Sequence, residues 1–292
     1  MFVSCSHIRI SDKMRQLIAL RLIFKTLFFF GFFPLISPLT ANADTFALRM
    51  NDRQEGTSKY YHELLTSALA LNGHTLKIIN KGDLPPKRLV IMFEKGGLDI
   101  VWLLKSKERN KKYIDINVDL TNGLMGQRVL FIPPDSTEDY AHIKTVDDFR
   151  QSQKVGAFGA NWFDEEVWRA NNLPYRVIDG HWRSIYDRLL LSRPETTDRP
   201  FHYFSRSVTE IVQEAKHYPK LAIEPNLLFK YDRDFHFYIN EENRHLKFIL
   251  EQALRKAKKT GLMDKLIQKH FAEQLKSLKL ENRVLLQLTT PQ

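Results

Sequence analysis

Short apolar runs alternate with segments of helical periodicity along most of the chain after residue 43. The run at 98–104 is apolar except for Asp99, as expected of a strand that is buried on both faces. Apolar residues at 58–71 recur at helical spacing, and Asn72-Gly73 ends that predicted helix. The pattern predicts strands at 45–50, 75–80, 98–104, 127–132, 154–158, 175–178, 201–204, 221–229 and 234–239. Because helical segments separate most of these strands, we predict parallel sheets with helices packed against them.

The same alternation restarts after Pro133-Pro134, which indicates a second α/β unit. Thr145 with Asp148 resembles a capping box, and Ser207 with Glu210 predicts another one that opens a helix. The chain then returns to add strands and two C-terminal helices. This order predicts two lobes joined by crossing strands.

The two C-terminal helices also carry a cluster of basic residues. Its members are Arg255, Lys256, Lys258, Lys259 and Lys265. An apolar stripe with helical spacing runs between them, so we interpret the cluster as a solvated helix face. A basic binding patch is the alternative.

The first 43 residues have the organisation of a secretory signal peptide. Arg15, Arg21 and Lys25 form a basic segment that precedes an uncharged apolar run from Leu27 to Leu39. Ala41-Asn42-Ala43 then fits the small-x-small cleavage pattern. We predict removal of 1–43 and a periplasmic mature protein that begins at Asp44; an uncleaved membrane anchor is the alternative.

Loss of this leader changes what the composition indicates. The net charge falls from +10 to +6, and Cys5, the single cysteine, is removed. The mature chain can therefore hold neither an internal disulfide nor a cysteine-based zinc site. Export also argues against DNA or RNA as partner, although basic proteins often bind nucleic acid.

Several short motifs together resemble those of the bacterial extracellular solute-binding proteins of the amino-acid-transporter type. They are Gly96-Gly97-Leu98-Asp99, Ser106-Lys107-Glu108-Arg109, the strand and glycine turn at 154–159, and the glycine-to-leucine step at 261–266. The resemblance implies an α/β, two-lobe periplasmic binding protein type II fold, in which hinge strands join two mostly parallel sheets flanked by helices. It implies a first lobe at 44–131 and 220–292, and a second lobe at 132–219.

The resemblance also assigns a binding residue. Arg109 matches the family's arginine that pairs with the carboxylate of the ligand, a task that suits a planar guanidinium. Further candidates for the ligand site are Trp102, Tyr60, Asn161, Trp162 and Arg206. Core packing is the alternative for the aromatic residues, helix capping for Asn161, and a surface position for Arg206.

The sequence departs from the amino-acid binders at one strand end. These proteins place an aspartate there for the ligand's ammonium group, whereas residues 201–206 read FHYFSR. This favours an anionic or aromatic ligand over a free α-amino acid. His202 and His236 lie in aromatic strands without metal-ligand spacing, and no catalytic or nucleotide-binding motif is present, so we expect no metal and no cofactor.

These observations predict a periplasmic solute-binding protein that is not an enzyme. It would act as a monomer and deliver a small carboxylate-bearing ligand to an inner-membrane transporter or sensor. It would contact the membrane itself only through an uncleaved leader. Two alternatives remain: a dehydratase-like enzyme that acts on a cyclic carboxylic acid, and an accessory protein that acts by protein contact.

Overall fold

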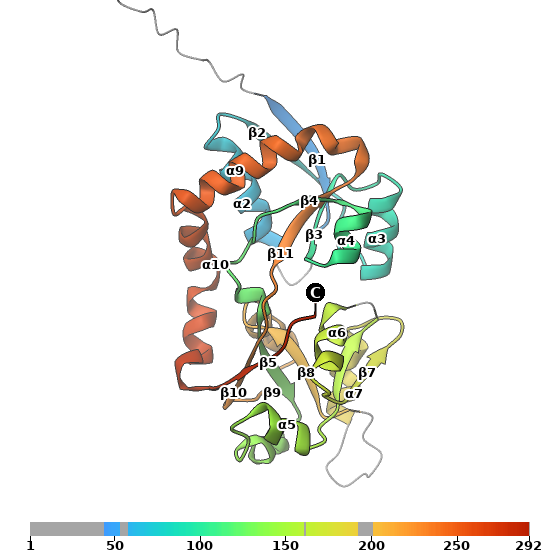
Figure 1. Ribbon diagram of the computed structural model, residues 1–292, viewed down its shortest axis with the longest axis vertical. Coiled ribbons are helices and arrows are strands. Elements are labelled where there is room, and N and C mark those ends of the chain that lie inside the picture. Colours follow the sequence, from blue (N-terminus) through green and yellow to red (C-terminus); the bar gives the residue numbers. More distant parts are fainter. Residues whose placement is uncertain (1–43, 53–57, 161, 192–200, 292) are drawn as a thin grey trace, which may run out of the picture. The chain divides into compact units, whose positions relative to one another are not determined.

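A computed structural model describes residues 44–52, 58–160, 162–191 and 201–291 of the 292-residue chain (Figure 1). The signal peptide predicted at 1–43 and the candidate Asn161 lie outside the described residues. In the described ranges, no helix is long and apolar enough to cross a membrane. The helices and strands form two lobes.

The first lobe, in the upper half of Figure 1, is built on two small sheets. Its elements are β1 (Thr45–Met50), α2 (Ser58–Ala70), β2 (Thr75–Asn80), α3 (Pro86–Glu94), β3 (Ile100–Leu104), α4 (Lys107–Lys112), β4 (Ile114–Ile116), β11 (Phe235–Ile239), α9 (Lys247–Lys259) and α10 (Leu262–Leu278). β1 and β2 are parallel, and β11 lies antiparallel between β3 and β4. Asp99 donates its backbone N–H to the carbonyl of Arg49 at 2.9 Å, which joins the two sheets.

The core of this lobe follows the apolar spacing of the sequence. Leu64 and Leu65 of α2 are fully buried, and α2 packs against α9 and α10. The apolar stripe of α9 is buried in the same core through Leu250, Ala253 and Leu254. Since each large aliphatic side chain contributes roughly 1.5–3 kcal/mol when it is removed from water, these helices are held mainly by packing.

The second lobe is built on one seven-stranded sheet. Its elements are β5 (Gln127–Ile132), α5 (Val146–Gln151), β6 (Gly156–Gly159), α6 (Phe163–Ala170), β7 (Tyr175–Ile178), α7 (Ser184–Leu191), β8 (Tyr203–Ser207), α8 (Ile211–His217), β9 (Ala222–Ile223), β10 (Leu227–Lys230) and β12 (Val284–Gln287). The strand order is β12-β10-β5-β8-β6-β7, and β9 also pairs with β5. β6 is parallel to β7 and β8, whereas β5 is antiparallel to its three partners.

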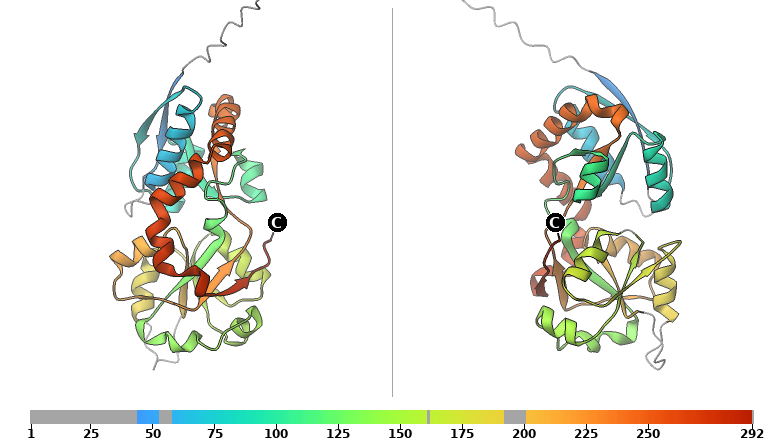
Figure 2. Two further views of the ribbon diagram at one scale, coloured as in Figure 1. Left: turned by 90° about the vertical axis from the view of Figure 1, so that its left-hand side faces the viewer. Right: turned by 45° about the vertical axis from the view of Figure 1, so that its right-hand side comes forward.

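Two segments of the chain cross between the lobes, one from β4 to β5 and the other from β10 to β11. The buried carboxylate of Asp234 joins them, since it accepts from Thr121 N at 3.1 Å, Thr121 Oγ1 at 2.7 Å and Gly123 N at 2.6 Å. α10 provides a third connection, visible in Figure 2, and ends with Leu278 in the apolar cluster of the second lobe. The last strand, β12, then pairs with β10.

The strands of the two lobes can be compared with the segments that the sequence assigned to each lobe. The boundaries themselves, after 131 and after 219, stay predictions. The sheets show that β5, β10 and β12 all belong to the seven-stranded sheet, although we assigned most of β5 and all of 220–292 to the first lobe. Of the strands described after residue 219, β11 alone belongs to a sheet of the first lobe, where it lies between β3 and β4.

Of the two capping boxes, only one is present. Thr145 Oγ1 accepts from Asp148 N while the Asp148 side chain accepts from the backbone of Thr145, which confirms the first. The second was wrong: Ser207 is the last residue of β8, and its hydroxyl accepts from Thr209 N at 3.2 Å. α8 begins only at Ile211, because the Glu210 carboxylate is buried in an ion pair instead.

Candidate functional site

α4 places Arg109 at the end of β3, where the first lobe faces the second. Ser106 caps this helix and accepts from Arg109 N at 3.2 Å. The half-buried guanidinium donates to the carbonyl of Leu104. Burial lowers the pKa of Arg109, and the nearby acidic groups of α6, Glu166 and Asp164, partly offset this effect. Arg109 is therefore a charged donor of the first lobe within electrostatic range of the second.

Glu166 is the acidic counterpart on α6. Burial and the like charge of Glu108 raise its pKa above the usual range, and Arg109 opposes the rise. Among the described residues, neither Arg109 nor Glu166 forms an ion pair with a partner. The two side chains therefore carry opposite charges on facing lobes without neutralising each other by direct contact.

The neighbouring acid on α6 has a different role. Asp164 is buried and forms an ion pair with Arg128 of β5 at 2.6 Å. It also accepts from Tyr231 Oη at 2.9 Å. Asp164 thus links α6 to the seven-stranded sheet through a buried ion pair. Glu166 of the same helix is only half-buried.

One ion pair joins the lobes directly. Arg183, just before α7, lies 3.1 Å from the carboxylate of Asp83, which lies between β2 and α3. Both side chains are 17% exposed. The guanidinium also lies 4.8 Å over the ring of Trp182. This ion pair therefore connects the segment before α7 in the second lobe with the segment before α3 in the first lobe.

Arg206, a sequence candidate for the ligand, lies in an internal network instead. Its guanidinium donates to Glu214 from Nε at 2.8 Å and lies 3.0 Å from the carboxylate of Glu210. The rings of Trp162 and Trp182 each lie 5.0 Å from it. Because its Nε and Nη2 atoms are engaged with buried carboxylates, Arg206 is held within the second lobe.

The aromatic candidates lie mostly in cores. Trp102 is buried and stacks on Tyr61 with ring centroids 4.9 Å apart. Tyr60 is buried against Phe271 and donates to the carbonyl of Leu120 at the start of a crossing segment. Trp162 is half-buried and packs against Trp182. In the case of Trp102 and Tyr60, these contacts fit the core alternative that we weighed from the sequence.

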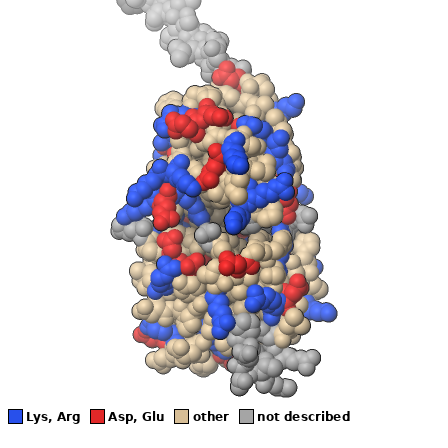
Figure 3. Space-filling model, turned by 90° about the vertical axis from the view of Figure 1, so that its right-hand side faces the viewer, with Lys and Arg blue, Asp and Glu red and all other residues tan. Residues whose placement is uncertain are grey.

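Side chains of both charges lie on the face where α4 and α6 are found. Figure 3 shows several Lys and Arg side chains around the middle of that face, with Asp and Glu side chains above, among and below them. α4 contributes Lys111 and Lys112 in its last turn, and α6 has three acidic residues in its first turn. In the part of the chain that the structure describes, no group of His, Cys, Asp and Glu could hold a metal ion.

No protein-family model matches the chain, and no curated protein matches it. Solved structures do. An ancestral arginine-binding protein bound to arginine matches with a TM-score of 0.54 at 16% identity, over 77% of this chain and 98% of that one. An amino-acid ABC transporter substrate-binding protein from Streptococcus pneumoniae, bound to L-arginine, matches with 0.54 at 17% identity, over 79% and 96%. The fold is that of the two-lobe periplasmic binding proteins.

A third similar structure extends the comparison. It is an ancestral amino-acid-binding protein, a precursor of cyclohexadienyl dehydratase, which matches with a TM-score of 0.52 at 15% identity, over 77% of this chain and 95% of that one. The binding-protein fold confirms the predicted α/β class and the resemblance given by the motifs. At this level of identity the likeness shows the fold.

Sequence reasoning missed parts of the site that depend on distant contacts. Glu166 was not singled out from the sequence, because acidic residues in the first turn of a helix, where α6 carries three, are usually explained by the helix dipole. Asp83 and Arg183 lie 100 residues apart, and neither belongs to a motif. In a binding-protein fold, a charged residue in a loop after a strand is a signal that could have singled out Asp83.

Proposed function

We propose that the protein is a periplasmic solute-binding protein. It captures a small ligand with a carboxylate between its lobes and presents the closed form to a membrane transporter or sensor. The ligand acts by lowering the free energy of the closed form relative to the open form, and no bond is made or broken. Ligands of such folds bind where two lobes meet.

One observation carries the proposal: Arg109 of α4 is half-buried within electrostatic range of Glu166 of the second lobe, and it has no carboxylate partner among the described residues. A half-buried guanidinium is expensive to leave without a strong acceptor. A ligand carboxylate would accept two parallel hydrogen bonds from it. The arginine-binding structures of the same fold support this role, since their ligand carries a carboxylate.

The opposite lobe restricts the ligand further. Arg206 is neutralised by Glu210 and Glu214, so it offers no second cationic partner. Glu166 remains as a half-buried acceptor opposite Arg109. We therefore favour a ligand that joins a carboxylate to a hydrogen-bond donor or a cationic group, and this departs from the anionic or aromatic ligand that the sequence at 201–206 favoured.

A thermal-shift screen tests the proposal. The chain from Asp44 onward is heated with amino acids, small carboxylates, sugars and peptides. A ligand at 100 times its dissociation constant should stabilise the native state by about 2.7 kcal/mol. Arg109→Ala should abolish the shift, because the carboxylate loses its bidentate partner.

Lys111→Ala is the matched control, because Lys111 is an exposed cation of the same helix. It should leave the shift unchanged. An equal shift in wild type and Arg109→Ala would contradict the proposed site. Mass spectrometry of the exported protein should find Asp44 as the first residue, and retention of 14–43 would contradict the location.

Two observations allow the alternative functions, a dehydratase-like enzyme and an accessory protein, to be tested. Glu166, with its raised pKa beside Glu108 and Arg109, could serve as a general acid in a dehydratase. Turnover of a cyclic carboxylic acid that is lost in Glu166→Gln would establish that activity. The internal network of Arg206 instead suits an accessory protein without ligand, which would show no thermal shift with any compound.

A further inference from the structure

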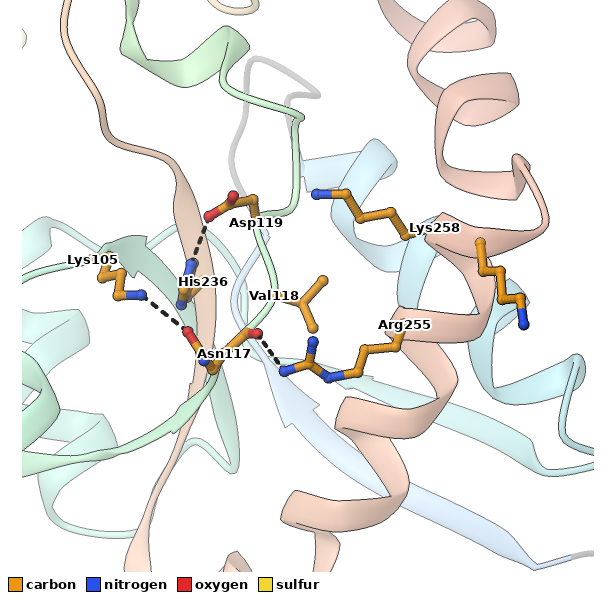
Figure 4. Close-up of a pocket in the computed structure, with 8 residues that line it drawn as sticks. Lys105, Asn117, Val118, Asp119, His236, Arg255 and Lys258 are labelled. Carbon is orange, nitrogen blue, oxygen red and sulfur yellow. Dashed lines mark hydrogen bonds and ion pairs between the residues drawn. The ribbon is translucent and has the colours of Figure 1, made fainter.

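A groove lined by positive charge lies in the first lobe, between α9 and the strands β4 and β11. Its volume is about 450 Å³, and Figure 4 shows the side chains around it. The charged and titratable side chains of the lining are Lys105, Asp119, His236, Arg255, Lys258 and Lys259. Arg109 and Glu166 do not line it, so it is separate from the proposed ligand site.

The cations of this groove come from distant parts of the sequence. Lys105 follows β3, whereas Arg255, Lys258 and Lys259 belong to the last turns of α9. From the sequence we interpreted the α9 cluster as a solvated face. A solvated face does not require Lys105 to join it from another element, so the convergence around a cavity favours the binding patch.

The polar contacts inside the groove leave positive charge unmatched. Lys105 donates to Asn117 Oδ1 at 3.0 Å, and Arg255 donates to the Asn117 carbonyl at 3.2 Å and to Glu251 at 2.5 Å. Lys258 and Lys259 form no hydrogen bond or ion pair with any described residue. Four cations therefore surround the cavity, and Asp119 is the single carboxylate of its lining.

That carboxylate is already engaged by a buried histidine. His236 Nδ1 lies 2.7 Å from Asp115, and its Nε2 lies 2.9 Å from Asp119. Because ionised carboxylates can only accept, both bonds require both ring nitrogens to carry protons. The imidazolium of His236 balances one of these two carboxylates, and Arg255 pairs with Glu251 at 2.5 Å, so the three lysines of the lining outnumber the one carboxylate charge that remains.

We propose that this groove is a second binding site, which takes a small anion bearing phosphate groups. Several donors arranged around one cavity suit an oxyanion with two or more charges, which accepts from several cations at once. The volume falls in the range of small-molecule sites and exceeds the need of a single monovalent ion. The site is independent of the ligand proposed for Arg109.

Calorimetric titration of the mature chain with pyrophosphate, at constant ionic strength, tests this site. Wild type should bind with saturation, and acetate should not compete. Lys258→Gln with Lys259→Gln should weaken binding about tenfold or more, since two charged hydrogen bonds are lost.

The matched control is Lys247→Gln with Lys265→Gln, which removes two exposed cations outside the groove. It should change the affinity less than about twofold, because screened distant charges contribute little. Arg109→Ala should bind pyrophosphate as wild type does, which separates this proposal from the first. Equal weakening in both double variants, or no saturable binding to the folded wild type, would overturn the second site.

Discussion

Arg109, just after β3 in the first lobe, and Arg206, near the end of β8 in the second, are the two arginines that the sequence offered for ligand binding. Arg109 is half-buried, and among the described residues its guanidinium donates to the backbone of its own lobe, at Leu104. Arg206 is buried and held by Glu210 and Glu214. The comparison shows that two arginines near strand ends can have different surroundings: Arg206 is already paired with carboxylates, whereas Arg109 has no such partner among the described residues.

The largest expected effect follows from breaking the network of Arg206. Glu214→Ala should lower the free energy of unfolding by about 3–5 kcal/mol, because it leaves a buried guanidinium short of a partner. Arg109→Ala should cost less than about 1 kcal/mol, since no charge pair is broken. Urea unfolding of both variants measures the difference. A smaller loss for Glu214→Ala than for Arg109→Ala would reverse the comparison.

The aromatic side of the Arg206 network gives a second prediction. A Cβ added at Gly159 would lie 2.8 Å from Trp162 Nε1 and 3.2 Å from Trp182 Cβ. Gly159→Ala should therefore destabilise the second lobe by about 1–3 kcal/mol through overpacking. Thermal unfolding measures it, and a change in the Trp fluorescence should accompany it. An unchanged melting temperature would show that the two rings can move apart.

His236 gives the first lobe its own buried charge pair, with a dependence on pH. Burial lowers the pKa of His236, but its bonds to Asp115 and Asp119 raise it further, so the net shift is upward. Its stabilisation is therefore complete below the unfolded pKa of about 6.5 and lost as pH rises through the raised folded pKa. Lys105 opposes the shift.

We expect the stability of wild type relative to His236→Asn to fall from about pH 6 to about pH 9. Chemical unfolding over that range measures the trend. His217→Asn, at an exposed histidine on α8, is the control and should show no such trend. A constant difference between wild type and His236→Asn would mean that the imidazole is not charged in the fold.

The smallest effect concerns the contact between the lobes. The pair of Asp83 and Arg183 is partly exposed, so a double-mutant cycle with Asp83→Ala and Arg183→Ala should give a coupling of less than about 1 kcal/mol. Closure should nevertheless respond, because the two residues belong to different lobes. If the coupling free energy were as large as that between Arg206 and Glu214, the contact between the lobes would contribute as much stability as the buried network of the second lobe.

Much of the fold could be predicted from local pattern. The predicted β1 and β2 have the observed bounds, and the helix between them was predicted one residue too long. The run Lys107–Lys112 was not predicted as helix because it has no apolar stripe, and its cap at Ser106 alone is a weak signal. The helix start predicted at Ser207 is the opposite error, a helix end predicted where there is none. The Glu210 carboxylate pairs with buried Arg206 and does not cap a helix.

The candidate site could be predicted only in part. Arg109 was found through a motif, and its half-burial near Glu166 agrees with the expected role without testing it. Arg206 and Trp102 could not be assigned from sequence, because their partners Glu214 and Tyr61 depend on tertiary packing. The positively charged groove could not be predicted for the same reason. Lys105 follows β3, and it meets Lys258 and Lys259 of α9 only in the folded chain.

The pairing of β12 with β10 has a consequence for how the molecule reaches this structure. Leu227 of β10 lies opposite Val284, and Phe229 lies opposite Arg128 of β5. The sheet of the second lobe therefore combines β5, from the first half of the chain, with β12, from close to its last residues. Pairings of such long range form slowly. A chain still being synthesised would hold β10 with one edge unpaired until residue 284 emerges, and during that time the exposed edge would favour aggregation.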